Sequence, residues 1–145
     1  MPIVNISQKK DIPTTVDGAL TWAAEQLKLV RLKNEYAGPL VEVGDKIIRF
    51  PAEVKDETRP NSLRDVFAAD PTAVINDWKV SDMAYVDMTA ELLQEVKMSG
   101  FAHINSCFTV ERVKLDQLLA LAAENNLQGI IAYVESGQLE TGWPA

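Results

Sequence analysis

The spacing of apolar residues predicts a long helix near the start of the chain, over residues 15–36. One set recurs at alternating steps of four and three, which places it on one face of a helix: Val16, Leu20, Ala23, Leu27 and Val30. A second set lies on another face, where Trp22, Leu29 and Tyr36 repeat every seven residues with Leu32 beside them. A surface helix needs only one apolar stripe, so the second predicts either a central helix or a surface that meets a partner.

Residues 40–50 predict a β-hairpin, which is the clearest local structure in the chain. Segments rich in β-branched and other apolar residues lie on both sides of Gly44 and Asp45, a pair that suits a two-residue turn. In this register the side predicted to be buried holds Val41, Val43, Ile48 and Phe50. We therefore expect a sheet that contains this hairpin and packs against the long helix.

Residues 51–62 carry two prolines among charged side chains, and we predict a mobile loop there. The part of the chain before this loop is too short for a domain of its own, which favours a single domain over residues 1–145. After the loop, the pattern predicts helices over 63–69 and 71–78, a strand over 83–88, and a helix over 89–98 that Gly100 ends.

The last third of the chain predicts a C-terminal β-α-β unit. An extended segment over residues 102–110, a helical stripe that ends near residue 126, and a buried strand over residues 129–134 follow one another. Leu118 and Ile131 are expected in the core, and residues 136–145 are expected to form an irregular tail that only Trp143 anchors. The fold class is therefore α+β or α/β, with one mixed sheet.

Composition and charge narrow the class of protein. The 145 residues are 47 % hydrophobic, which is ordinary for a globular protein, and no run approaches the roughly 20 apolar residues of a membrane span. The start of the chain lacks the charged and apolar blocks of a signal peptide, and one cysteine excludes an internal disulfide. We therefore expect a soluble cytoplasmic protein. The net charge of −7 comes entirely from residues 60–145, which argues against nucleic-acid binding.

The sequence offers little catalytic chemistry. It contains no glycine-rich phosphate loop and no paired-cysteine metal motif, so we expect no cofactor and no metal. His103 and Cys107 invite comparison with a catalytic pair, but on one extended strand their Cα atoms would lie roughly 13 Å apart. If Asn105 and Ser106 instead form a tight turn, the two side chains point to opposite faces. Both arrangements predict a small buried cysteine and a half-exposed histidine.

Pro2 supports a different hypothesis. If Met1 is removed, the chain begins Pro-Ile-Val-Asn-Ile, a strand with a free secondary amine at its end. This opening, followed by a long helix and another strand, resembles the tautomerase superfamily. The resemblance covers about a third of the chain and implies an enzyme in which the N-terminal proline is the acid–base catalyst.

Three functions follow from these patterns. The surplus apolar stripe and the missing catalytic motifs favour a non-catalytic interaction protein, such as an adaptor, inhibitor, immunity-type or assembly factor. Its partner would be another protein or a second copy of the chain, bound through Trp22, Leu29, Leu32 and Tyr36. The alternative is a tautomerase-like enzyme that uses Pro2, and the third is a small-ligand-binding module with an apolar pocket.

Overall fold

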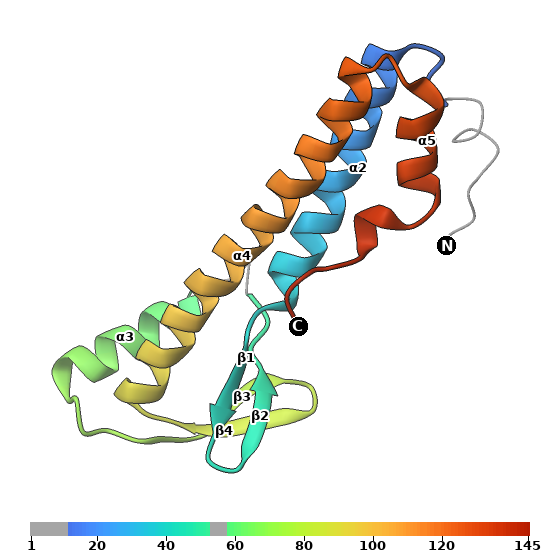
Figure 1. Ribbon diagram of the computed structural model, residues 1–145. Coiled ribbons are helices and arrows are strands. Elements are labelled where there is room, and N and C mark those ends of the chain that lie inside the picture. The colour runs from blue at the N-terminus through green and yellow to red at the C-terminus, as the bar shows by residue number, and fades with distance from the viewer. Residues whose placement is uncertain (1–11, 53–57) are drawn as a thin grey trace. The chain divides into compact units, whose positions relative to one another are not determined.

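The computed structural model describes residues 12–52 and 58–145, the latter without the side chains of 58–60 (Figure 1). The elements in chain order are α2 (Val16–Ala37), β1 (Leu40–Val43), β2 (Lys46–Arg49), α3 (Thr58–Ala69), β3 (Ile75–Ser81), β4 (Ala84–Met88), α4 (Ala90–Ala123), α5 (Leu127–Glu135) and a 3₁₀ turn, η1 (Gln138–Glu140). The mixed helix-and-sheet class and the long N-terminal helix are confirmed. No helix in the described part combines the length and the apolar run that a membrane crossing requires.

The chain forms two compact units, each with its own core. Unit 1 comprises Met1–Arg31 and Phe108–Trp143, and unit 2 comprises Leu32–Cys107 with Pro144–Ala145. The helices α2 and α4 each contribute one part to each unit. We describe the two units separately.

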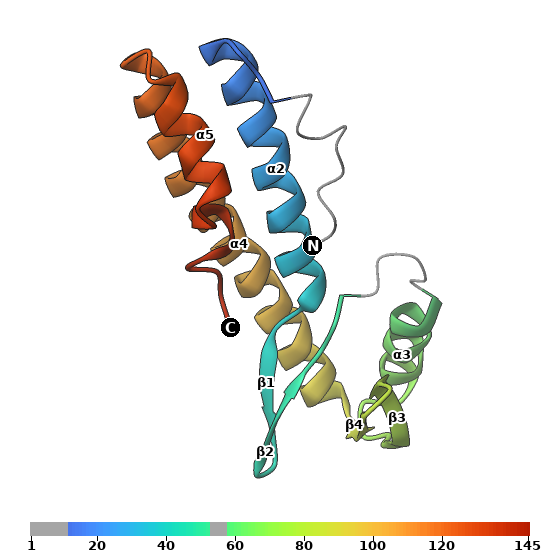
Figure 2. The same cartoon turned by 90° about the vertical axis from the view of Figure 1, so that its right-hand side faces the viewer.

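In the described residues, unit 1 consists of helices. Its buried cluster consists of Ala19, Ala23, Leu27, Leu118, Ile130 and Leu139, all between 0 and 2 % exposed. The two alanines let the helices approach closely, because their side chains end at Cβ. The chain reverses after α4, where the Asn126 side chain accepts a hydrogen bond from the Gly129 N–H at 2.8 Å, and α5 turns back (Figure 2). The prediction for Leu118 is confirmed, whereas Ile130 rather than Ile131 is the fully buried isoleucine.

Unit 2 is built around two hairpins. The strands β1 and β2 pair in the predicted register, with Val41 opposite Ile48, and β3 pairs with β4. The hairpins contribute to one core that also takes residues from α3 and α4: Val41, Phe50, Leu63, Phe67, Val86, Met88 and Leu92. The prediction of one mixed sheet is wrong, because the described strands form two separate two-stranded sheets. Side chains of α3 and α4 cover the apolar sides of the two sheets, where we expected further strands.

The predicted C-terminal β-α-β unit is also wrong, because α4 runs without interruption from Ala90 to Ala123 and α5 covers residues 127–135. Gly100 does not end α4, since a glycine inside a helix costs only about 1 kcal/mol and packing outweighs it. The buried positions of α4 in this stretch follow helical steps: His103, Cys107, Lys114 and Leu118. The short apolar run at residues 130–134 is ambiguous between strand and helix, and it forms α5.

Three smaller predictions also need correction. Of the predicted loop over 51–62, residues 53–57 lie outside the described residues, and the stretch from Thr58 belongs to α3. The predicted helix over 71–78 is absent because the Asp70 carboxylate accepts hydrogen bonds from the Thr72 hydroxyl and N–H, which forms a turn before β3. In the predicted irregular tail, η1 buries Leu139 to 1 % exposure, and its carbonyl accepts the Trp143 Nε1–H at 2.7 Å.

Candidate functional site

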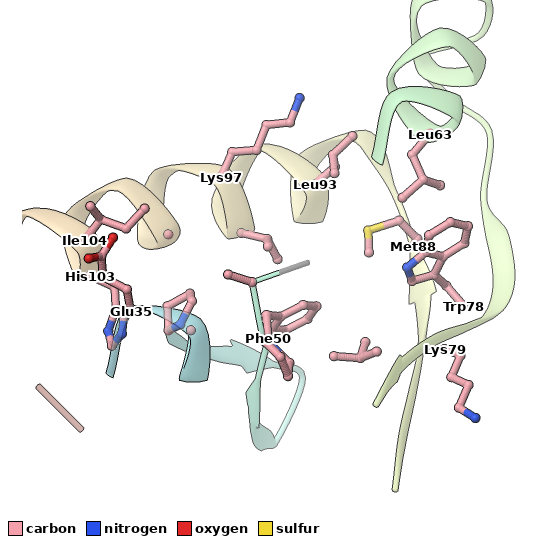
Figure 3. Close-up of a pocket in the computed structure, with 17 residues that line it drawn as sticks. Glu35, Phe50, Leu63, Trp78, Lys79, Met88, Leu93, Lys97, His103 and Ile104 are labelled. Carbon is pink, nitrogen blue, oxygen red and sulfur yellow. The ribbon is translucent and has the colours of Figure 1, made fainter. Parts of the chain in front are cut away.

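Unit 2 contains a pocket of about 240 Å³ (Figure 3). Its walls come from elements far apart in the sequence, and the apolar lining includes Phe50, Leu63, Trp78, Met88, Leu93 and Val96. Phe50 follows β2, Leu63 lies on α3, and Trp78 lies on β3. The same side chains contribute to the core of unit 2, so the core positions the walls of the pocket.

Charged and polar side chains lie at the edge of this pocket. Lys79 and Lys97 extend away from Phe50 (Figure 3), and the Lys79 ammonium lies 3.4 Å from the Asp82 carboxylate. The His103 ring also lines the pocket, and its Nε2 lies 2.7 Å from the Asn34 carbonyl oxygen. Because a carbonyl oxygen only accepts, Nε2 carries the proton and donates it to this bond. The interior of the pocket is therefore mainly apolar.

The indole of Trp78 supplies one polar group to the pocket wall. The ring nitrogen lies on the side of the indole that faces Phe50 and the pocket (Figure 3). No residue in the described ranges accepts a hydrogen bond from this N–H, and it is not sealed from solvent. Buried or half-buried indole N–H groups usually find an acceptor, so this donor is available to a bound molecule.

His103 and Cys107 lie closer together than predicted, but they do not form an activated pair. Both lie on successive turns of α4, and the Cys107 Sγ lies 3.9 Å from the His103 Nε2. The expected separation was wrong because this segment is a helix, in which residues four apart share a face. The nitrogen nearer the thiol already donates its proton to Asn34, so it cannot accept one from Cys107. Cys107 is buried as predicted, whereas His103 is buried rather than half-exposed.

The predicted partner-binding residues are divided between the two units. In unit 1, Leu29 is 59 % exposed, and Trp22 is half-buried without packing against the buried cluster. In unit 2, Tyr36 is 44 % exposed and Leu32 is half-buried. None of the four lines the pocket. Pro2 lies outside the described residues, so the tautomerase hypothesis stays a prediction.

The sequence pattern predicted neither the residues of the pocket nor a second exposed apolar group. The pocket residues come from separate elements, and their neighbours in sequence carry no shared motif. On α4, Met98 and Phe101 are 65 and 80 % exposed. Their spacing of three residues suits one side of a helix, but the predicted end of the helix at Gly100 separated them. Within the described residues, no three His, Cys, Asp or Glu side chains gather in a way that would hold a metal ion.

Comparison with known proteins gives a family but no function. The family described as Domain of unknown function (DUF4376) matches residues 19–135, and the chain therefore belongs to this family. The matched range includes most of α2, all of α4 and both hairpins. No curated protein and no solved structure matches the chain.

Proposed function

We propose that this chain is a non-catalytic protein that binds another protein or a second copy of itself through the outer face of α2. The observation that supports this most directly is the exposure of Leu29, which is 59 % accessible in a helix that buries Ala19, Ala23 and Leu27 on another face. Because the helix is already formed, a partner that covers an exposed apolar side chain on it does not have to order the backbone. Binding therefore loses less conformational entropy.

Trp22 strengthens the proposal for unit 1. It lies seven residues before Leu29, on the same face of α2, and it does not belong to the packed cluster of that unit. Its indole N–H has no acceptor in the described parts of the chain. Tryptophan at the centre of an interface contributes both a large apolar area and a hydrogen-bond donor, which makes it a frequent anchor residue.

Leu32 and Tyr36 extend the proposal to the part of α2 that belongs to unit 2. Tyr36 presents an apolar ring with a polar hydroxyl, and such side chains are enriched in interfaces. Two charged residues, Glu25 and Lys33, lie within or beside this face, and both are exposed on α2. A polar rim around an apolar centre is typical of interfaces that also remain stable in water.

The proposal includes a cytoplasmic location without nucleic-acid binding. One cysteine in the whole sequence leaves no possibility of an internal disulfide, which fits a reducing compartment. The net charge of −7 disfavours contact with phosphate backbones.

The test compares Leu29→Glu with Gln128→Glu, which adds the same charge at an exposed position of α5 in the same unit. We expect both variants to keep stability within about 1 kcal/mol of the wild type. Light scattering over a range of concentrations then measures self-association, which Leu29→Glu should abolish and Gln128→Glu should preserve. A large loss of stability in Leu29→Glu alone would mean that Leu29 belongs to a core and would contradict the proposal.

If the wild type is a monomer, a photo-crosslinking amino acid at position 29 tests for another protein in cells. We expect one discrete cross-linked species that disappears when Trp22→Ala is added and that is absent with the crosslinker at position 128. Absence of both self-association and a discrete cross-linked species would overturn the proposal.

A further inference from the structure

The pocket of unit 2 supports an inference that does not depend on the proposed function of α2. We propose that this pocket binds a small molecule with one aromatic ring or a branched aliphatic group of similar size, which carries a carbonyl or carboxylate oxygen. The size of the pocket, the nature of its walls and the position of one hydrogen-bond donor each support a part of this ligand description.

The size limits the apolar part of the ligand. The pocket volume is about 240 Å³. An apolar cavity of about 150 Å³ is large enough for benzene, whereas pockets for drug-sized ligands start at about 300 Å³. A volume between these two values suits one ring with a short substituent. Larger ring systems would extend out of the pocket.

The walls favour an aromatic or branched aliphatic group. Phe50 and Trp78 present rings to the pocket, and Met88 supplies a polarizable sulfur atom near Trp78 (Figure 3). Rings attract other rings in offset or edge-to-face contacts, and methionine adapts to irregular shapes. Both charged groups on the right and upper sides of the view, Lys79 and Lys97, lie outside this apolar centre.

The indole N–H of Trp78 requires an acceptor on the ligand. It faces the pocket (Figure 3), and no described residue accepts its hydrogen bond. A purely apolar ligand would displace water from this donor without replacing the bond, which lowers affinity. A ligand with a carbonyl or carboxylate oxygen restores the bond, so the pocket should prefer it.

The charged side chains at the edge of the pocket affect whether it prefers a ligand with a neutral carbonyl or one with a carboxylate. Lys97 lines the pocket, is exposed and has no ion-pair partner in the described part of the chain, whereas Lys79 is paired with Asp82. Glu35 contributes a negative charge elsewhere on the lining. The source of the acceptor oxygen is therefore a question for the experiment.

Three probes of similar size test the proposal: ethylbenzene, which has no acceptor, acetophenone, which has a neutral carbonyl, and phenylacetate, which has a carboxylate. Binding is followed by the ¹H–¹⁵N signals of the three indole groups, with the signal of Trp78 assigned from Trp78→Phe. We expect the Trp78 signal to move while the signals of Trp22 and Trp143 stay in place. Acetophenone should bind about five- to tenfold more tightly than ethylbenzene. Trp78→Phe, in which binding is followed by the backbone amide signals of the pocket residues, should remove this preference. Tighter binding of phenylacetate that Lys97→Gln removes would identify the carboxylate as the preferred source.

A second pair of variants tests the pocket without changing Trp78. Gly100 lines the pocket, and a Cβ atom added there would meet no other atom within 4 Å. Gly100→Leu should therefore fill part of the pocket and weaken binding of acetophenone at least tenfold, while Gly100→Ala should weaken it much less. Both variants should fold at least as well as the wild type, because Gly100 lies inside α4. An unmoved Trp78 signal with all probes, equal affinity for ethylbenzene and acetophenone, or unchanged binding in Gly100→Leu would each overturn the proposal.

Discussion

The two units differ in how completely they bury their cores. In unit 1, the six residues of the buried cluster are 0 to 2 % exposed, and helices supply all of them except Leu139 on η1. In unit 2, the seven residues of the cluster are 2 to 8 % exposed and come from hairpins, helices and the residue that follows β2. A two-stranded sheet covers a smaller area of a core than a long helix does. The core of unit 2 is therefore closer to solvent than the core of unit 1. The unit with the less complete core is the one that contains the pocket.

The two units also differ in the hydrogen bonds of two tryptophans, Trp143 in unit 1 and Trp78 in unit 2. In unit 1, the Trp143 Nε1–H donates to the Leu139 carbonyl at 2.7 Å, which fastens the end of the chain. In unit 2, the Trp78 N–H has no acceptor in the described ranges. Unit 1 also pairs Arg31 with Glu111, with the guanidinium above the Phe108 ring. In these places the polar groups of unit 1 bind one another, whereas the Trp78 indole of unit 2 keeps a hydrogen-bond donor without an acceptor in the described ranges.

Leucine-to-alanine changes in the two cores give the largest expected effect. Leu118 is 0 % exposed, so Leu118→Ala should reduce the free energy of unfolding by about 3–5 kcal/mol through lost burial and an empty cavity. Leu63 is 4 % exposed and lines the pocket, so water can enter the space left by Leu63→Ala, and the loss should be about 2–3 kcal/mol.

Chemical denaturation measures both losses. Leu119→Ala is the matched control in α4, because Leu119 is 44 % exposed and its truncation should cost less than about 1 kcal/mol. A greater loss in Leu63→Ala than in Leu118→Ala would reverse the proposed difference between the units.

Local sequence signals predicted the elements that depend on local chemistry. The hairpin at residues 40–50 has its predicted register because the two-residue turn at Gly44 and Asp45 determines which residues of the two strands pair. The long helix α2 followed from a pattern that repeats over six turns. Of the four residues predicted to bind a partner, Leu29 and Tyr36 are exposed and Trp22 and Leu32 are half-buried, and their role stays a prediction.

The wrong predictions concern residues whose local preference for helix or strand is weak or misleading. Gly100 carries a helix-ending signal, yet residues on both sides of it pack into buried cores, and α4 continues. The apolar run from Ile130 suits a strand or a helix equally, and only its packing against unit 1 decides between them. The pocket was not predictable, because Phe50, Trp78 and Leu93 become neighbours only after folding.

Two glycines with positive φ provide a test specific to unit 2. Gly38 has a φ of 77°, and an added Cβ would lie within 2.9 Å of backbone atoms of Phe50 and Pro51. Gly44 has a φ of 64° but no atom within 4 Å of an added Cβ. Gly38→Ala should therefore cost about 2–4 kcal/mol, from overpacking and backbone strain together, and Gly44→Ala only about 1 kcal/mol from strain alone.

The ¹H–¹⁵N signals of the three indole groups show which unit is destabilised in each variant. In Gly38→Ala, the signal of Trp78 should broaden or move before those of Trp22 and Trp143, because the last two belong to unit 1. Equal losses in the two glycine variants would contradict the close approach of Gly38 to Phe50. Simultaneous loss of all three signals would show that the two units unfold together.

The smallest expected effect is a dependence on pH that belongs to unit 1. Lys114 is buried, its ammonium donates to the Gln138 carbonyl at 2.5 Å, and burial lowers the pKa of Lys114 below its ordinary value of 10.5, although Glu140 opposes this shift. Between the lowered pKa and 10.5 the unfolded chain binds more protons than the folded chain, so the free energy of unfolding should rise with pH over that interval. Burial raises the pKa of Tyr133 above 10.0, which acts in the opposite direction. The wild type must therefore be compared with Lys114→Met, in which Tyr133 is unchanged.

At neutral pH the free energies of unfolding of Lys114→Met and the wild type should differ by no more than about 1 kcal/mol, because the loss of the hydrogen bond offsets the gain from no longer burying a charge. Denaturation of both proteins from neutral pH to 10.5 should show the stability of the wild type gaining on that of Lys114→Met, and a constant difference would mean that the Lys114 ammonium is as well solvated in the folded chain as in the unfolded one.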